Sequence, residues 1–202
     1  MVDYSIENEY REKGFDIICG VDEAGRGPLA GPVYAAAVIL PSYCVIEGLN
    51  DSKKLTEKKR EALFDEIKEK ALAYGIASAD EKEIDEINIL NATFLAMKRA
   101  INSLSVKPDL ALIDGNQKPH TDIEEVTVIK GDAKSMSIAA ASVLAKVSRD
   151  RFMLEMAEKY PQYEFARHKG YGTKLHYEKI AQYGVCDIHR RTFLKKILGE
   201  QK

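Results

Sequence analysis

The sequence has little of what marks secreted and membrane-spanning proteins. Its 202 residues include three cysteines, Cys19, Cys44 and Cys186, which lie far apart and form no CxxC pair, so we expect reduced thiols rather than disulfides. No apolar run approaches the roughly 20 residues that a membrane span requires. The N-terminus has neither a basic start nor an apolar signal core. These absences predict a cytoplasmic protein that makes no membrane contact.

Two active-site signatures are also missing. The motif HExxH is absent and the four histidines lack zinc-ligand spacing, which argues against a zinc site. The motif GxxxxGK[ST] is absent too, which removes the commonest phosphate-binding loop of nucleotide-binding proteins. The net charge is only −2, but residues 146–202 carry 13 Lys and Arg against 7 Asp and Glu, and the remainder carries 17 against 25. A basic C-terminal quarter suits a polyanion, while the acidic remainder supplies carboxylates.

The chain is organised around residues 17–33. An apolar run ends in the adjacent carboxylates Asp22 and Glu23, a glycine-rich turn follows, and a second apolar run leaves it, which predicts a strand, a tight connection and a returning strand. Two such carboxylates are suitable ligands for a hard divalent cation. Because neighbouring side chains on a strand point to opposite faces, we expect a bend or bulge, which Gly25 would permit. A solvated acidic pair at a strand end is the alternative.

The turn contains Gly25, Gly27 and Gly31 with one arginine, Arg26, among them. Glycines let a backbone approach a phosphate or a sugar without side chains in the way. Metal ligands beside such a backbone cradle suggest a site that acts on phosphate esters. An ordinary turn, or a nucleotide-binding protein that uses the turn as a phosphate cradle, remains open from these residues.

Further along the chain, two more aspartates occupy promising positions. Residues 109–114 are apolar on both faces, which predicts a central parallel strand that ends at Asp114, and sites tend to lie at the carboxyl ends of such strands. Asp132 follows the next strand and precedes a long helix, where the helix dipole also favours an acid for purely structural reasons. We expect strands at 74–79 and 125–130, and helices at 1–16, 57–72 (capped by Thr56), 81–104 (weak at 88–91), 135–159, 174–183 and 187–198.

Four carboxylates at three places suit hydrolysis of a phosphodiester by two cations. In such sites two ions roughly 3.5–4 Å apart clamp the attacking water and the leaving oxygen. Mg²⁺ keeps several waters, so each ion needs only a few protein carboxylates. Without a cation the carboxylates would repel and raise one another's pKa values.

The string Gly-Val-Asp-Glu-Ala-Gly-Arg-Gly-Pro-Leu-Ala-Gly-Pro at 20–32 resembles the signature of the type 2 ribonuclease H family, the bacterial ribonuclease HII. The resemblance covers almost the whole chain in the expected order. Its other blocks are Asp51-Ser52-Lys53-Lys54-Leu55, Asp114-Gly115-Asn116, Gly131-Asp132-Ala133-Lys134-Ser135, His168-Lys169-Gly170-Tyr171-Gly172-Thr173 and His189-Arg190-Arg191.

The resemblance implies an α/β, ribonuclease H-like fold: a mixed five-stranded sheet flanked by helices, with a C-terminal helical region. Residues 1–160 would form the catalytic core and 161–202 a helical cap of the same domain that contributes to substrate binding. The acidic ligands of the family correspond to Asp22, Glu23, Asp114 and Asp132, with Asp22 shared between two Mg²⁺ or Mn²⁺ ions.

The resemblance also implies substrate-binding roles. Gly25, Arg26 and Gly27 would read the 2′-hydroxyl and the adjacent phosphates, largely through the backbone, in agreement with the turn's glycine content. Tyr171 would stack on the sugar beside the scissile position; the alternative is an ordinary loop tyrosine packed on the C-terminal helices. The lysines assigned to phosphates or to the ordering of the carboxylates are Lys53, Lys134 and Lys146, although surface lysines are usually only solvated.

The implied activity is cleavage of the RNA strand of RNA–DNA hybrids, and cleavage 5′ of ribonucleotides embedded in duplex DNA. The products would carry 5′-phosphate and 3′-hydroxyl ends. The alternative is a non-catalytic module that binds RNA–DNA hybrids on the same fold. We expect a monomer, because no strong exposed apolar seam is evident in the sequence.

Overall fold

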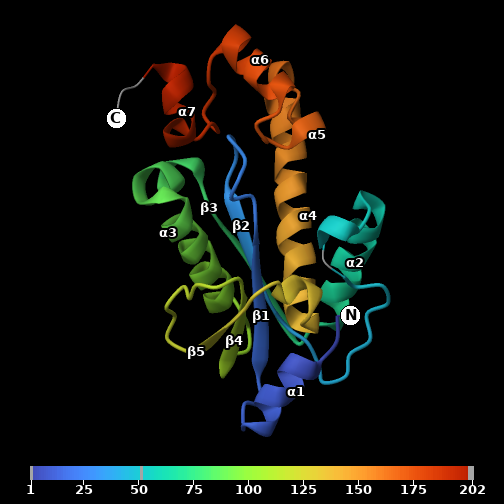
Figure 1. Ribbon diagram of the computed structural model, residues 1–202. Helices are drawn as coiled ribbons and strands as arrows, with labels where there is room; N and C mark the ends of the chain where they lie inside the picture. The colour runs from blue at the N-terminus through green and yellow to red at the C-terminus, as the bar shows by residue number, and fades with distance from the viewer. Residues whose placement is uncertain (1, 51, 200–202) are drawn as a thin grey trace.

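The computed structural model describes residues 2–50 and 52–199. At its centre is a sheet with strand order β3-β2-β1-β4-β5 (Figure 1). The first three strands in this order pair antiparallel, whereas β1–β4 and β4–β5 pair parallel. The mixed five-stranded sheet expected from the sequence is therefore confirmed. The strands are β1 (Ile18–Ala24), β2 (Val33–Ile39), β3 (Ala73–Ala79), β4 (Leu110–Asp114) and β5 (Glu124–Val128).

Helices cover both faces of the sheet (Figure 1): α4 packs on one face, over β1 and β2, and α3 on the other. The α-helices are α1 (Ser5–Glu12), α2 (Glu57–Lys70), α3 (Glu81–Asn102), α4 (Met136–Lys159), α5 (Phe165–His168), α6 (Lys174–Tyr183) and α7 (Arg191–Leu198). Single 3₁₀ turns are η1 (Ser52–Lys54), η2 (Gly131–Ala133) and η3 (Pro161–Tyr163). No helix in these described stretches is long and apolar enough to cross a membrane.

The helix α4 lies unusually close to β1 because the residues between them are small. A Cβ atom on Gly20 would lie 2.1 Å from the backbone carbonyl carbon of Ser137, so only glycine permits this approach. The helix is buried along Ala139, Ala140 and Ala141, and short side chains bring its backbone near the sheet. Ser135 caps its N-terminus by accepting a hydrogen bond from the amide of Ile138. This packing fixes the strand that carries Asp22.

Several predicted details are confirmed. Thr56 caps α2 by accepting a hydrogen bond from the amide of Lys59, and α3 has a break at Asn88, whose φ is 66°. Two expectations are wrong. The β1–β2 ladder is regular from Gly20↔Val38 to Ala24↔Tyr34, without a bulge. The last helix begins at residue 191 rather than 187.

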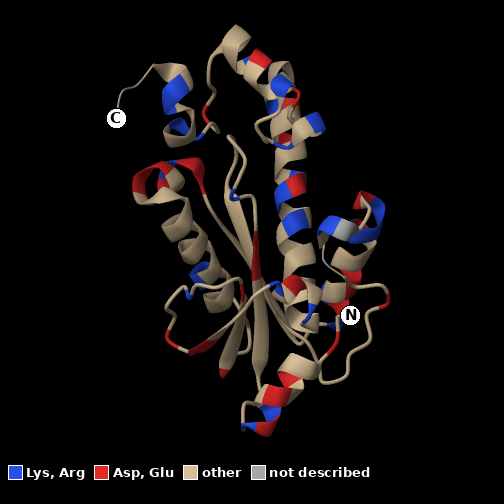
Figure 2. Cartoon of the chain, viewed as in Figure 1, with Lys and Arg blue, Asp and Glu red and all other residues tan. Residues whose placement is uncertain are grey.

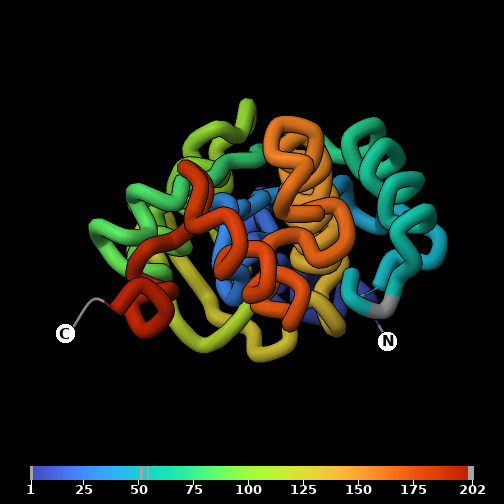
Figure 3. Tube along the Cα trace, turned by 90° about the horizontal axis from the view of Figure 1, so that it is seen from above, coloured from blue at the N-terminus to red at the C-terminus, as the bar shows by residue number. Residues whose placement is uncertain are grey.

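The late start of α7 has a tertiary cause. His189 pairs with Ala30 of the β1–β2 turn in an antiparallel bridge, and the amide of Gly31 donates to the carbonyl of Ile188. These bonds hold the segment before α7 in an extended conformation. Seen from above, the C-terminal segment crosses over the β1–β2 turn (Figure 3).

Two buried histidines connect this segment to the loop that carries Tyr171. The amide of Cys186 donates to His189 Nδ1 (2.9 Å), the two Nε2 atoms lie 3.1 Å apart, and His176 Nδ1 lies 3.0 Å from the carbonyl of Tyr171. Because an amide only donates and a carbonyl only accepts, His189 Nε2 carries a proton and His176 Nε2 accepts it. Both rings are therefore neutral, and burial lowers the pKa of each to about 4.

The histidine pair predicts sensitivity to acid. The unfolded chain takes up protons near the ordinary histidine pKa of about 6.5, whereas the folded chain resists protonation down to about pH 4. The contribution of the neutral histidine pair to the free energy of unfolding is therefore fully present above pH 6.5, and it is lost as the pH drops from 6.5 to 4. We expect His189→Gln to reduce the loss of melting temperature between pH 7 and pH 5, and the exposed control His120→Gln to leave it unchanged. Equal losses in both variants would contradict this assignment.

Candidate active site

The first two candidate acids lie next to each other on β1, the middle strand in the sheet order, and Figure 2 shows an acidic (red) stretch on this strand. Asp22 is buried, with 4% exposed, and its Oδ1 accepts a hydrogen bond from the amide of Glu23 at 2.7 Å. Its carboxylate also interacts with the hydroxyl of Ser142 on α4. The Glu23 carboxylate lies 3.4 Å from Nη1 of Arg26. The regular strand thus holds two acids with different partners.

The other two acids meet where β4 ends. The Oδ1 atom of Asp114 accepts hydrogen bonds from the amides of Gly131 (2.6 Å) and Asp132 (3.4 Å). This interaction fixes the turn η2 against the end of the strand. Asp132 is 6% exposed, and its Oδ2 lies 3.5 Å from Nζ of Lys53. The position predicted for Asp114, at the carboxyl end of a parallel strand, is confirmed.

The acids crowd one another electrostatically. Burial raises the pKa of Asp22 well above its usual value, and the charges of Glu23 and Asp114 raise it further. Burial raises the pKa of Glu23, with Arg26 opposing the shift. Burial and the charge of Asp132 raise the pKa of Asp114. Such a group of acids is favoured in its ionised form only when positive charge is placed among them.

An all-oxygen donor set of this kind fits Mg²⁺ or Mn²⁺ in its chemistry. Within residues 2–50 and 52–199, however, no three His, Cys, Asp or Glu side chains are arranged so that they could hold one ion. The residues present match a divalent cation by ligand type and by unmet negative charge.

A cavity of about 200 Å³ lies beside the acids. It brings together most of the residues to which the family resemblance assigns substrate binding, and Tyr171 on its wall is 44% exposed. The cavity is lined by these predicted site residues: Glu23, Gly25, Arg26, Lys53, Lys146 and Tyr171. The glycine turn, one acid and the loop tyrosine thus share one cavity, although they lie up to 148 residues apart in sequence.

Three predicted residues are less well placed. Nζ of Lys146 is bound to Asp150 at 2.6 Å, one turn further along α4. Lys134 is exposed and does not line the cavity. Gly27 does not line the cavity either, but a Cβ atom on Gly27 would lie 3.9 Å from the ring of Tyr171, which does. Asp51, which belongs to the resembling Asp51–Leu55 block, lies outside the described residues.

Sequence reasoning missed two buried arginines behind the turn. Arg149 on α4 is 1% exposed and its guanidinium lies over the ring of Tyr171, 5.7 Å from the centroid. Arg190 is completely buried below the turn. An isolated arginine in a sequence is typical of a solvated surface, and the only available signal for Arg190 was its place in a block that resembles the family.

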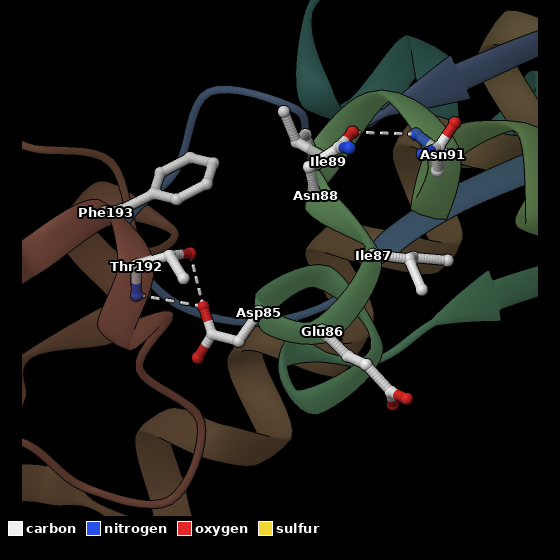
Figure 4. A pocket seen from close by; sticks show the side chains of 8 residues that line it. All are labelled: Asp85, Glu86, Ile87, Asn88, Ile89, Asn91, Thr192 and Phe193. Carbon is white, nitrogen blue, oxygen red and sulfur yellow. Dashed lines mark hydrogen bonds between the residues drawn. The ribbon is translucent and has the colours of Figure 1, made fainter.

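A larger cavity lies elsewhere. It has a volume of about 590 Å³ and opens between the break in α3 and helix α7 (Figure 4). At its edge the carboxylate of Asp85 accepts hydrogen bonds from the amide and the hydroxyl of Thr192. It shares no residue with the group of four acids. The candidate active site therefore lies at the smaller of these two cavities.

The strand order, the parallel pairing of β1 with β4 and the two covering helices define a ribonuclease H-like fold. The solved ribonuclease H2 of Pyrococcus horikoshii superposes on 92% of this chain and 97% of its own, with a TM-score of 0.76 at 30% identity. The structure of the PCNA:RNase HII complex from Archaeoglobus fulgidus covers 87% of this chain and 94% of that one, with a TM-score of 0.67 at 26% identity.

The sequence relatives are more specific. Residues 19–196 match the family model described as Ribonuclease HII. A protein named Ribonuclease HII from Caldicellulosiruptor bescii is 58% identical over 196 residues, which are 97% of this chain and 95% of that protein. One from Acetivibrio thermocellus is 59% identical over 95% of this chain and 75% of its own length. The chain belongs to the ribonuclease HII family, which confirms the resemblance found in its motifs.

Proposed function

We propose that this chain is an endonuclease that hydrolyses the RNA strand of RNA–DNA hybrids and cuts 5′ of ribonucleotides embedded in duplex DNA. The observation that carries the proposal is one cavity that joins Glu23 to the glycine turn and to Tyr171. Acids, a backbone cradle and an aromatic ring at one place match the hydrolysis of a phosphodiester next to a ribose. Membership of the family supports the same reaction.

In this proposal Asp22, Glu23, Asp114 and Asp132 hold two Mg²⁺ or Mn²⁺ ions, with Asp22 as the shared ligand. When bound, such ions lower the pKa of a coordinated water and stabilise the leaving 3′ oxygen, which gives 5′-phosphate and 3′-hydroxyl ends. The protein's own contribution is to fix the carboxylates: the amides of Gly131 and Asp132 hold Asp114, and α4 holds β1.

Substrate recognition is assigned to the walls of the cavity. Gly25, Arg26 and Gly27 contact the 2′-hydroxyl and the phosphates, and Tyr171 stacks on the adjacent sugar. Lys53 neutralises a phosphate beside Asp132. The roles of Lys134 and Lys146 are peripheral contacts with phosphates, because the first is exposed and the second is paired with Asp150. Contacts of this kind read the backbone and predict little base preference.

We further propose that residues 161–202 form a substrate-binding cap on the 1–160 core, and that the chain works as a cytoplasmic monomer. Residues 200–202 of this cap lie outside the described residues. Figure 2 supports the cap's role, because basic residues gather on the upper part of α4 and on α5–α7. An excess of basic residues in this part of the chain suits the phosphates of a duplex.

The proposal is tested on a labelled DNA duplex that contains one ribonucleotide, with Mg²⁺, Mn²⁺ or EDTA. We expect one metal-dependent cut on the 5′ side of the ribonucleotide, with a 3′-hydroxyl on the upstream fragment. Cleavage of a long RNA–DNA hybrid alone would contradict the roles of Tyr171 and the glycine turn. Tight binding of both duplexes without any cleavage would favour the hybrid-binding alternative.

A further inference from the structure

The β1–β2 turn rests on one buried guanidinium group. Arg190 is 0% exposed, and each of its three nitrogens donates to the backbone of the turn. Nη2 donates to the carbonyl of Gly25 (2.6 Å), Nη1 to those of Arg26 (3.0 Å) and Pro28 (2.8 Å), and Nε to that of Gly31 (2.8 Å). The planar fork of arginine is the only side chain that can satisfy four carbonyls in this way.

These bonds determine which way the peptide units face. In a trans peptide the carbonyl of one residue and the amide of the next point in opposite directions, and the chain has no cis peptide bonds among its described residues. When Arg190 draws in the carbonyls of Gly25 and Arg26, the amides of Arg26 and Gly27 therefore turn outward. Neither amide donates to a backbone carbonyl within the described part of the chain.

The outward face of the turn borders the candidate substrate cavity. Gly25 and Arg26 line it together with Tyr171. Outward amides above a buried positive charge form a donor surface suited to the oxygens of a phosphate or a ribose. The amide of Arg190 itself donates to the carbonyl of Leu29 at 2.9 Å. Its neighbour His189 contacts His176, which bonds to the carbonyl of Tyr171. The same segment thus sets both the turn and the Tyr171 loop.

We propose that Arg190 is a positioning residue for substrate recognition: it holds the amides of Arg26 and Gly27 outward, toward the ribonucleotide. This inference rests on the proposed function and adds a residue to which no substrate contact is assigned. An apolar side chain at this position would leave these four carbonyls without a donor, which is costly for buried groups. The guanidinium therefore fixes the direction in which the turn carbonyls point.

The test compares the wild-type chain with Arg190→Lys and with the matched control Arg191→Lys, whose side chain is exposed. Lysine keeps the charge but cannot hold four carbonyls. We expect Arg190→Lys to lower kcat/KM on the single-ribonucleotide duplex by about 10- to 100-fold, mostly through KM, because two backbone contacts lose their alignment. Arg191→Lys should stay within about twofold of the wild type, as exposed substitutions usually do.

A second readout separates positioning from simple stabilisation and needs no catalysis. Chains labelled with ¹⁵N are titrated with the same duplex in EDTA, and the amide signals of Arg26 and Gly27 are followed. We expect both signals to shift in the wild type and in Arg191→Lys, and to shift much less in Arg190→Lys at a temperature where it is folded. Equal shifts in all three chains, or unchanged kcat/KM in Arg190→Lys, would overturn the inference.

The two proposals fail in distinguishable ways. A wild-type chain that cuts neither duplex contradicts the proposed function, whereas the amide titration still decides whether Arg190 orients the turn for binding. If Arg190→Lys does not fold, hydrogen exchange in the wild type decides instead. Protection of the Arg26 and Gly27 amides by about tenfold or more on addition of the duplex supports the outward orientation, and unchanged exchange overturns it.

Discussion

Replacing Asp22 by asparagine is expected to abolish cleavage while leaving the fold intact or more stable. The substitution removes the proposed shared metal ligand, so the rate on the single-ribonucleotide duplex should fall by at least about 10³-fold. The side chain is buried, and burial together with Glu23 and Asp114 raises its pKa. An amide of the same shape escapes this electrostatic cost and can still accept the 2.7 Å hydrogen bond from the Glu23 amide.

The stability effect has a definite sign. A group whose pKa is raised by folding destabilises the native state once the pH exceeds its unfolded value, because the folded chain must then carry an unfavourable charge. At pH 7 Asp22→Asn should therefore melt at the same temperature or higher, by about 2–4 °C for each kcal/mol regained in a chain of this size. Gain of stability with loss of activity is the pattern expected of a site kept strained for function.

The measurement pairs single-turnover cleavage with thermal unfolding at pH 7, with Asp16→Asn as the matched control. Asp16 is exposed and precedes β1 by two residues. Asp16→Asn should change neither the cleavage rate nor the melting temperature by more than surface substitutions usually do. Metal-dependent cleavage by Asp22→Asn at more than about a tenth of the wild-type rate would contradict the ligand assignment.

The positions of the acids at the ends of strands and before a helix could be predicted from the sequence because their signal is local. An apolar run that is buried on both faces and ends in Asp114 requires a central strand, and the structure places it between β1 and β5. Similarly, the predicted cap Thr56 accepts a hydrogen bond from a residue only three positions further along the chain. Where a side chain's partner lies nearby in the chain, pattern alone was sufficient.

The errors concern contacts between distant segments. The start of α7 was placed too early because the bridge between His189 and Ala30, which prevents helix at 187–190, joins residues 159 apart. The expected bulge is absent: β1 pairs regularly with β2 as far as Ala24, and Glu23 faces Arg26 and the cavity from this regular strand. Arg149 and Arg190 bind backbone carbonyls. Because every residue has a carbonyl, the sequence does not show which carbonyls a distant arginine will bind.

Gly25 illustrates the same limit, because its necessity depends on a residue 124 positions away. Its φ is 98°, a conformation in which a side chain is strained, and a Cβ atom would lie 2.1 Å from Nε and 2.3 Å from Cδ of Arg149. Arg149 has little room to withdraw, because it is 1% exposed and Nη2 donates to the carbonyls of Ala30 (3.2 Å) and Lys169 (3.0 Å).

We therefore expect Gly25→Ala to cost about 1–3 kcal/mol in backbone strain and about 1–3 kcal/mol in overpacking. At about 2–4 °C per kcal/mol, the melting temperature should fall by roughly 4–24 °C. Cleavage at a temperature where the variant is folded should fall by about 100-fold, a loss of near 3 kcal/mol, because a displaced Arg149 moves both the turn and Tyr171.

Gly27→Ala is the matched variant, because it separates the geometry of the free protein from contact with the substrate. The nearest atom to its added Cβ is Cε1 of Tyr171 at 3.9 Å, an ordinary contact, and its φ is not in the left-handed region. Its melting temperature should equal that of the wild type, whereas kcat/KM on the ribonucleotide duplex should fall, since the methyl group lies where backbone and substrate approach. If Gly25→Ala were as stable and as active as Gly27→Ala, Arg149 would have moved aside at little cost. The conformation of the turn would then not depend on its contact with Arg149.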